Sequence, residues 1–148
     1  MPVYVTTQSA AKLGPTVPEL DISHAVGVWD KTKFSMALPD VLGDLKKRGI
    51  QDIAIVGIES HVCVLQTVLD LRAAGFGVWV IRDGVSSCNK EEVAVAVERM
   101  RGVGARVVSS EGWIFEVMGD AGVPQFREVQ KVIKNAKEET TAGLKALL

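Results

Sequence analysis

Five short apolar segments rich in valine and isoleucine constrain the fold of this chain more than any other feature. They lie at residues 3–7, 26–29, 53–56, 78–81 and 106–108. Their apolar residues do not alternate with polar ones, which is typical of strands buried on both faces. Segments with helical spacing separate them, and parallel strands need such crossovers. The order therefore predicts an α/β fold, a three-layer α/β/α sandwich with a mainly parallel, Rossmann-like sheet.

Four segments carry apolar residues at the spacing of an amphipathic helix. They run from Leu38 to Leu45, from Val62 to Ala73, from Val93 to Met100 and from Phe126 to Ile133. Gly49, Gly75 and Gly104 follow the first three, and glycine there ends a helix because it enters the left-handed region cheaply. Asn89 followed by Glu92 predicts a capping box at the start of the third helix.

Length and apolar content indicate a single folded domain over residues 1–148. A chain of 148 residues suits one domain, and an apolar fraction of 47% supplies a core. Residues 9–25 form the longest irregular stretch, because Pro15 and Pro18 exclude a regular helix or central strand. Residues 138–148 are predicted to be a polar tail.

The charge balance argues against several classes of partner. A formal net charge of −1 gives no electrostatic reason to bind nucleic acid or an anionic membrane. No apolar run reaches the roughly 18 to 20 residues that span a bilayer. Two cysteines are too few for a disulfide framework. We therefore expect a reduced, cytoplasmic protein, and the absence of a glycine-rich nucleotide motif or zinc spacing predicts no cofactor and no metal.

Cys63 is a candidate nucleophile because of its position. Residues 53–70 run from a buried strand through a tight turn into a helix that is predicted to begin near Ser60 or His61. Cys63 falls in the first helical turn, where free N–H groups and the helix dipole favour a thiolate and can hold an oxyanion. Position alone leaves a buried structural cysteine as the alternative.

A second candidate segment, WDKTKFSM, follows the strand at residues 26–29. Lys31 and Lys33 are therefore expected near the carboxyl end of a strand, where open α/β sheets bind their ligands. A lysine beside a cysteine can lower the pKa of the thiol or pass a proton. The segment alone is also compatible with a solvated surface lysine, and Phe34 with either core or pocket wall.

The remaining candidates are weaker. His61 either lines the pocket or is an exposed residue of the first helical turn. Cys88 is expected to be a bystander, and Asp83 to anchor the loop after its strand. Three aromatic residues are expected in the core or at a subunit contact, namely Trp29, Trp79 and Trp113.

Several motifs together resemble the isochorismatase-like cysteine hydrolases. They are GIESHVCVLQTVLDL, WDKTKFSM, LGPTVPEL, VIRDGVSSC and SSEGWIFEVMGDAGVPQFREVQKVIK. Over roughly residues 2 to 135, the chain is most similar to the eukaryotic isochorismatase domain-containing branch of this superfamily.

The resemblance implies an Asp–Lys–Cys triad in which Cys63 is the nucleophile and Lys31 the lysine. It also implies a cis peptide between Ile58 and Glu59, which directs the amide of Glu59, together with that of Cys63, at a substrate carbonyl oxygen. The residues expected around the substrate are then Glu59, Ile58, His61 and Phe34.

The triad aspartate of the family lies on a first strand that has no counterpart here, so we expect an N-terminally incomplete domain. Asp21, Asp30 and Asp83 do not match the motif of that aspartate. The family's first strand is central in its sheet, which predicts a gap between the strands at 3–7 and 53–56. Because unpaired buried backbone groups are costly, we also expect residues 1–148 alone not to form an active, stable enzyme.

The sequence thus predicts a hydrolase in which Cys63 attacks an amide or related carbonyl carbon of a small molecule, in a homo-oligomer (dimer or tetramer). The alternative is a non-catalytic binding or interaction protein on the same fold, because fold does not fix function. Rapid alkylation of Cys63 at neutral pH separates the two. A ribonuclease label carried by some relatives finds no support in the near-neutral charge.

Overall fold

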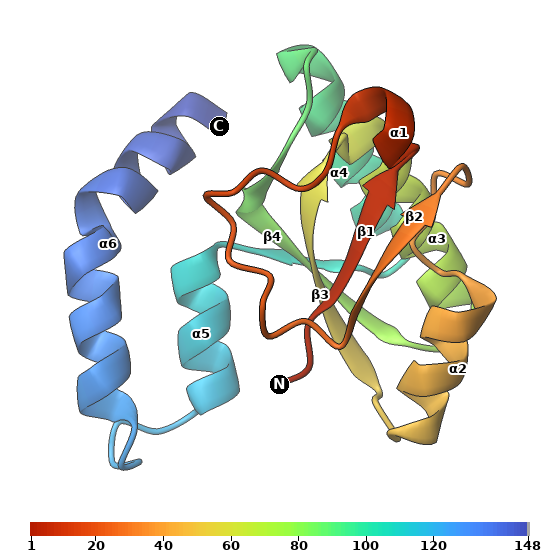
Figure 1. The fold of residues 1–148 in the computed structure, drawn as a ribbon. Coiled ribbons are helices and arrows are strands. Elements are labelled where there is room, and N and C mark those ends of the chain that lie inside the picture. Colours follow the sequence, from red (N-terminus) through yellow and green to blue (C-terminus); the bar gives the residue numbers. More distant parts are fainter. Residues whose placement is uncertain (148) are drawn as a thin grey trace. The chain divides into compact units, whose positions relative to one another are not determined.

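The computed structural model describes residues 1–147, and backbone contacts divide the chain into two compact units. The first unit is Met1–Ile50, and the second begins at Gln51. Each unit contains a parallel sheet accompanied by helices (Figure 1). The predicted α/β class with parallel strands is confirmed, whereas the single domain stays a prediction.

The first unit is built on a two-stranded parallel sheet. Its elements are β1 (Tyr4–Gln8), α1 (Ala10–Leu13), β2 (Gly27–Lys31) and α2 (Pro39–Lys47). The register places Gln8 opposite Lys31 at the carboxyl ends of both strands. Pro39 stands in the first turn of α2, where its missing N–H costs nothing. This helix buries Val41 and Leu45, as its apolar spacing predicts.

Tyr4 connects the sheet of the first unit to its helix. Its ring stacks on that of Trp29 with a centroid separation of 6.0 Å, and its hydroxyl donates to Asp44 Oδ2 of α2 at 2.6 Å. Arg48 Nε donates to the same oxygen at 2.6 Å. The Tyr4 hydroxyl, followed by Arg48, lowers the pKa of Asp44, which keeps this carboxylate ionised at neutral pH.

The second unit is a three-stranded parallel sheet with helices, and its strand order is β3-β4-β5. Its elements are β3 (Asp52–Ile58), a π-helical turn η1 (Ser60–Val64), α3 (Leu65–Ala73), β4 (Gly77–Ser86), α4 (Lys90–Gly102), β5 (Arg106–Val108), α5 (Ser110–Met118) and α6 (Phe126–Leu147). Among residues 1–147, no helix is long and apolar enough to cross a membrane.

The core of the second unit forms around β4, α3 and α4. Val78 and Val80 of β4 are buried, as are Val68 of α3 and Met100 of α4. Ile81 is also buried and lies on the opposite face of β4 from Val80, whereas Trp79 on that face is partly exposed, so the predicted burial on both faces holds for only part of the middle strand. The edge strand β3 does not, because Val56 is 59% exposed and lies on a strand with only one hydrogen-bonded neighbour.

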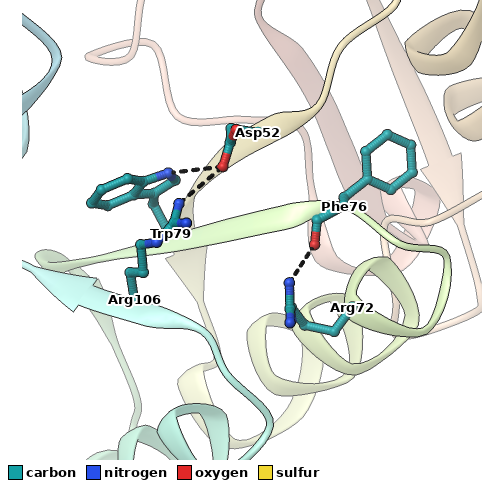
Figure 2. A network of polar contacts seen from close by, with 5 residues as sticks. All are labelled: Asp52, Arg72, Phe76, Trp79 and Arg106. Atoms are coloured by element: carbon teal, nitrogen blue, oxygen red, sulfur yellow. Dashed lines mark hydrogen bonds and ion pairs between the residues drawn. The ribbon is translucent and has the colours of Figure 1, made fainter.

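A polar network joins the three strands of this sheet (Figure 2). Asp52 Oδ1 accepts hydrogen bonds from Trp79 Nε1 at 3.4 Å and from Arg106 Nη1 at 3.0 Å. The guanidinium of Arg106 also lies 4.6 Å from the ring centroid of Trp79. A Cβ at Gly77 would overlap Asp52 Oδ1, so a side chain there would displace this exposed carboxylate from the network. Trp79 is thus partly exposed and stacks against Arg106. The prediction offered only the core or a subunit contact for this residue.

The pairing of β4 with β3 contains an irregularity that moves the end of β4. Ile55 lies opposite Val80, yet Gly57 lies opposite Val85, so β3 advances by two residues while β4 advances by five. Within this bulge the Asp83 carboxylate accepts the N–H and the hydroxyl of Ser110, at 2.7 and 2.5 Å. Asp83 therefore fixes the start of α5, and the prediction that it anchors the loop after its strand is wrong, because β4 continues to Ser86.

The strands of the described chain belong to two sheets, β1-β2 and β3-β4-β5. The predicted gap between the strands at 3–7 and 53–56 stays a prediction. An N-terminally incomplete domain stays a prediction.

Three local predictions need correction. Asn89 makes no side-chain cap at the start of α4, where the Glu92 N–H instead meets the Asn89 carbonyl at 3.3 Å. Residues 10–13 are helical because the excluding prolines begin only at position 15. The helix α5 was not predicted, because its apolar residues cover most of its surface and so lack helical spacing. They are Trp113, Ile114, Phe115, Val117 and Met118.

That residues 138–148 form a polar tail stays a prediction, and residue 148 lies outside the described residues. Residues 138–147 continue α6. The reason is a stripe of less exposed residues at helical spacing that persists beyond the charged positions 137–139. Its members are Phe126, Val129, Ile133, Ala136, Thr140 and Leu144.

Truncation of Met100 to alanine tests this packing. Met100 is 0% exposed, so Met100→Ala is expected to lower the free energy of unfolding by about 2 to 5 kcal/mol through lost burial and a residual cavity. Val95→Ala on the exposed side of the same helix is the control and should change it by less than about 0.5 kcal/mol. Urea unfolding measures both, and equal losses would contradict the described burial.

Candidate functional site

Cys63 lies in the π-helical turn between β3 and α3. The Glu59 carbonyl accepts the N–H groups of Val62 and Val64, both at 3.1 Å. The bond from Val64 spans five residues, which is the π pattern, whereas in an α-helix this carbonyl would receive the N–H of Cys63. The two residues beside Cys63 therefore occupy the acceptor that helical geometry would otherwise assign to it. The Cys63 carbonyl accepts the hydroxyl of Thr67 at 2.6 Å.

The peptide bond that leads into this turn is cis, as predicted, and joins Ile58 to Glu59. Ile58 is the last residue of β3 and is 65% exposed. Glu59 is half-buried, and its Oε2 accepts the N–H of Cys88 at 2.6 Å. Cys63 is half-buried and Cys88 exposed, and both are free thiols.

The end of β4 is hydrogen-bonded to the same turn. The buried Ser60 donates its hydroxyl to the Ser86 carbonyl at 2.9 Å and its N–H to Ser87 Oγ at 3.0 Å. His61 Nδ1 lies 3.0 Å from the same oxygen of Ser87. These contacts depend on the irregularity in β4, which places Ile58 opposite Ser86.

Lys31 ends β2 in the first unit and is buried, with 7% of its surface exposed. Its Nζ donates to Gln8 Oε1 at 2.6 Å and to the Phe34 carbonyl at 2.8 Å. Gln8 is itself fixed, because its Nε2 donates to the Thr32 carbonyl at 2.9 Å. Lys31 is therefore not a solvated surface lysine. Phe34 is 47% exposed and contacts Lys31 through its backbone, so its side chain is not core.

Asp30, the neighbour of Lys31, serves a different part of the first unit. Its Oδ1 accepts the N–H of Ala10 at 2.8 Å and the hydroxyl of Thr7 at 2.9 Å. These bonds, that of Ala10 first, lower the pKa of Asp30. The carboxylate thus anchors the start of α1, whereas the side chain of the adjacent Lys31 contacts Gln8 and Phe34, because neighbouring residues of a strand point to opposite faces.

The predicted site residues form two groups, one in each unit. The second unit gathers four of them around η1, namely Ile58, Glu59, His61 and Cys63. The first unit brings Lys31 together with the Phe34 backbone. Because both motifs end predicted strands, the sequence also predicts that Lys31 lies within about 8 Å of Cys63 at one sheet edge, and this stays a prediction. Among residues 1–147, no group of three or more His, Cys, Asp or Glu side chains could hold a metal ion.

Gln8 and Ser87 contribute to these groups but were not predicted from the sequence. Gln8 carries a signal, because it is a polar residue ending an apolar strand at the carboxyl edge. Ser87 carries no such signal in the sequence, because its position beside Ser60 follows from a bulge that no residue pattern predicts.

A family model described as the isochorismatase domain matches residues 1–112 of this chain. The chain belongs to the isochorismatase family. It is 44% identical over 140 residues to the secreted isochorismatase effector Isc1 of Phytophthora sojae, with 90% of the chain and 67% of that protein covered. It is 39% identical over 141 residues to isochorismatase domain-containing protein 1 of Salmo salar, with 95% of the chain covered, and spans only 50% of that relative's length.

Solved structures support the family assignment. A MAR1 ribonuclease from Caenorhabditis elegans superposes with a TM-score of 0.83 at 43% identity, covering 90% of this chain and 69% of the other. The nicotinamidase PncA from Bacillus subtilis gives a TM-score of 0.53 at 29% identity, covering 60% of this chain and 50% of the other. The chain is therefore similar to solved proteins that are named for different activities.

Replacement of Gln8 tests the environment of Lys31. Gln8→Ala removes the Oε1 acceptor of a buried ammonium and is expected to lower the free energy of unfolding by about 1 to 3 kcal/mol. Gln66→Ala, at an exposed position of α3, is the matched control and should have little effect. Denaturant unfolding followed by circular dichroism measures both, and an unchanged midpoint for Gln8→Ala would contradict the role given to its amide.

Proposed function

We propose that this protein is a hydrolase in which Cys63 attacks an amide or related carbonyl carbon of a small molecule. The observation that carries the proposal is the π-turn, where Val62 and Val64 share the Glu59 carbonyl. With that carbonyl occupied by its neighbours, the N–H of Cys63 is assigned the role of an oxyanion donor beside its own thiol. Family membership supports the same reading, since the solved relatives include a nicotinamidase, named for an amide substrate.

The proposed reaction has two stages. The Cys63 thiolate adds to the carbonyl carbon, and the resulting oxyanion is held by the N–H groups of Glu59 and Cys63. The carbon–nitrogen bond then breaks, the amine leaves with a proton, and a thioester remains on Cys63. Water hydrolyses the thioester, releases the acid and restores the thiol. The reaction uses a thiol, N–H groups and water and needs no cofactor.

Lys31 is assigned an electrostatic role in this scheme. The thiol proton passes to a carboxylate base, which the family resemblance assigns to an aspartate, and the charge of Lys31 keeps that base ionised. The burial of Lys31 supports the assignment, because a charge with little water around it acts more strongly on its neighbours. We further propose that the enzyme works as a cytoplasmic homo-oligomer.

Alkylation with iodoacetamide at neutral pH tests the nucleophile against the binding-protein alternative. Exposure alone predicts that Cys88 reacts first, because Cys88 is exposed whereas Cys63 is half-buried. An activated Cys63 should instead react at least about tenfold faster, as expected of a thiol with thiolate character. Peptide mass spectrometry resolves the two sites, with Cys88→Ala and Cys63→Ala as matched variants. Slower alkylation of Cys63 than of Cys88 would favour the non-catalytic alternative.

Substrate assays separate the small-molecule proposal from the ribonuclease name of the C. elegans structure. The full native chain is expected to hydrolyse small primary amides, and Cys63→Ala to lower kcat/KM by about 10³-fold or more, as for loss of a covalent nucleophile. Cys88→Ala should retain wild-type turnover. Cleavage of single-stranded RNA without turnover of any amide would contradict the proposal.

A further inference from the structure

Ser87 is placed to control the turn that carries Cys63. Its Oγ lies 3.0 Å from the Ser60 nitrogen and 3.0 Å from His61 Nδ1, so one hydroxyl contacts the first two residues of η1. The Ser60 contact is directional, because a backbone N–H can only donate. Ser87 Oγ therefore accepts from Ser60, and the hydrogen of its own hydroxyl remains available for His61.

The contact with His61 has a chemical consequence. A neutral imidazole carries one N–H donor and one acceptor nitrogen. When the Ser87 hydroxyl donates to Nδ1, the proton of the neutral ring must reside on Nε2. The half-buried ring then turns its acceptor nitrogen to Ser87 and keeps an N–H donor on its opposite edge.

We propose that Ser87 is a positioning residue that fixes His61 as the Nε2–H tautomer, and that this N–H donates to an acceptor oxygen of the substrate. The ligand chemistry that fits is a carboxylate or carbonyl oxygen next to the reacting carbon. The substrate contact rests on the proposed function, whereas the tautomer rests only on the contacts of Ser87.

The surrounding bonds explain why Ser87 can hold one geometry. Ser60 is fully buried and is tied to β4 a second time through the Ser86 carbonyl at 2.9 Å. Glu59 is tied to the same segment by the Cys88 N–H at 2.6 Å. Residues 86–88, at and just beyond the end of β4, thus contact residues 59–61 at the start of the turn. Among these contacts, only that of Ser87 reaches an imidazole.

Nitrogen-15 NMR of the imidazole tests the tautomer without any substrate. The chain has two histidines, so a His24→Gln background leaves His61 as the one imidazole observed. At a pH where the ring is neutral, we expect a pyrrole-type signal at Nε2 and a pyridine-type signal at Nδ1. Ser87→Ala should shift both signals toward the averaged values of mixed tautomers, and Ser87→Thr, which keeps the hydroxyl, should restore them.

Ser86→Ala is the matched control, because Ser86 contacts the turn through its backbone carbonyl. Its His61 signals should equal those of the parent. Identical signals in Ser87→Ala and the parent would overturn the inference, as would a pyrrole-type signal at Nδ1 in the parent. Either result leaves the alkylation test of Cys63 unaffected, so failure of this inference and failure of the proposed function are distinguishable.

Steady-state kinetics tests the substrate contact. For an amide that carries a neighbouring carboxylate or carbonyl oxygen, Ser87→Ala should lower kcat/KM by about tenfold, the usual cost of one lost hydrogen bond. Most of the change should appear in KM, because the contact exists in the bound substrate as well as the transition state. Ser87→Thr should recover most of the loss. An equal effect on amides that lack the neighbouring oxygen would overturn the substrate contact.

Discussion

The Glu59 carbonyl is the acceptor on which the geometry of the candidate site depends. It receives two N–H groups at 3.1 Å, from residues three and five positions further along the chain. A helix that begins in this way changes its pitch for one turn, and α-helical geometry resumes at Leu65. Because π-turns leave the regular hydrogen-bond ladder, they often occur where a residue has a function. Cys63 occupies the position between the two donors.

The bulge in β4 is the second constraint, and the turn relies on it. Had the register of Ile55 and Val80 continued unchanged, Ile58 would lie opposite Asp83, whereas it lies opposite Ser86. The irregularity therefore does two things at once. It brings the serine segment to the start of η1, and it frees Asp83 to bind the N–H and hydroxyl of Ser110. A change in the bulge should consequently disturb both the turn and the start of α5.

The elements of the fold could be predicted from the sequence because most of them obey simple periodicities. The segment 106–108 matches β5, and the apolar spacing around Val93 and Met100 matches α4. The predictions failed where the spacing of apolar residues gives no clear signal. The helix α5 is apolar on most sides, and α6 extends beyond a cluster of charges on a stripe that includes Thr140.

The candidate site was predictable only in part, for a related reason. Cys63, Ile58 and Glu59 are close in sequence, so a local motif was enough to place them around one turn, and the resemblance to the family implied the cis bond. Gln8 and Ser87 act across strands, and their partners follow from register. The register of β1 with β2 is regular, so the pairing of Gln8 with Lys31 could have been inferred. The register of β4 with β3 is irregular, so the contact of Ser87 with the turn could not have been inferred from the sequence.

A crystal structure with a small aldehyde bound is the most direct test of the central claim, that Cys63 attacks carbonyl carbon and its own N–H stabilises the oxyanion. An aldehyde such as propionaldehyde forms a thiohemiacetal with an activated thiol, and the adduct mimics the tetrahedral intermediate. The account predicts an adduct on Cys63 whose oxygen accepts hydrogen bonds from the N–H groups of Cys63 and Glu59. An adduct on Cys88 instead, or one on Cys63 whose oxygen points away from both N–H groups, would contradict it.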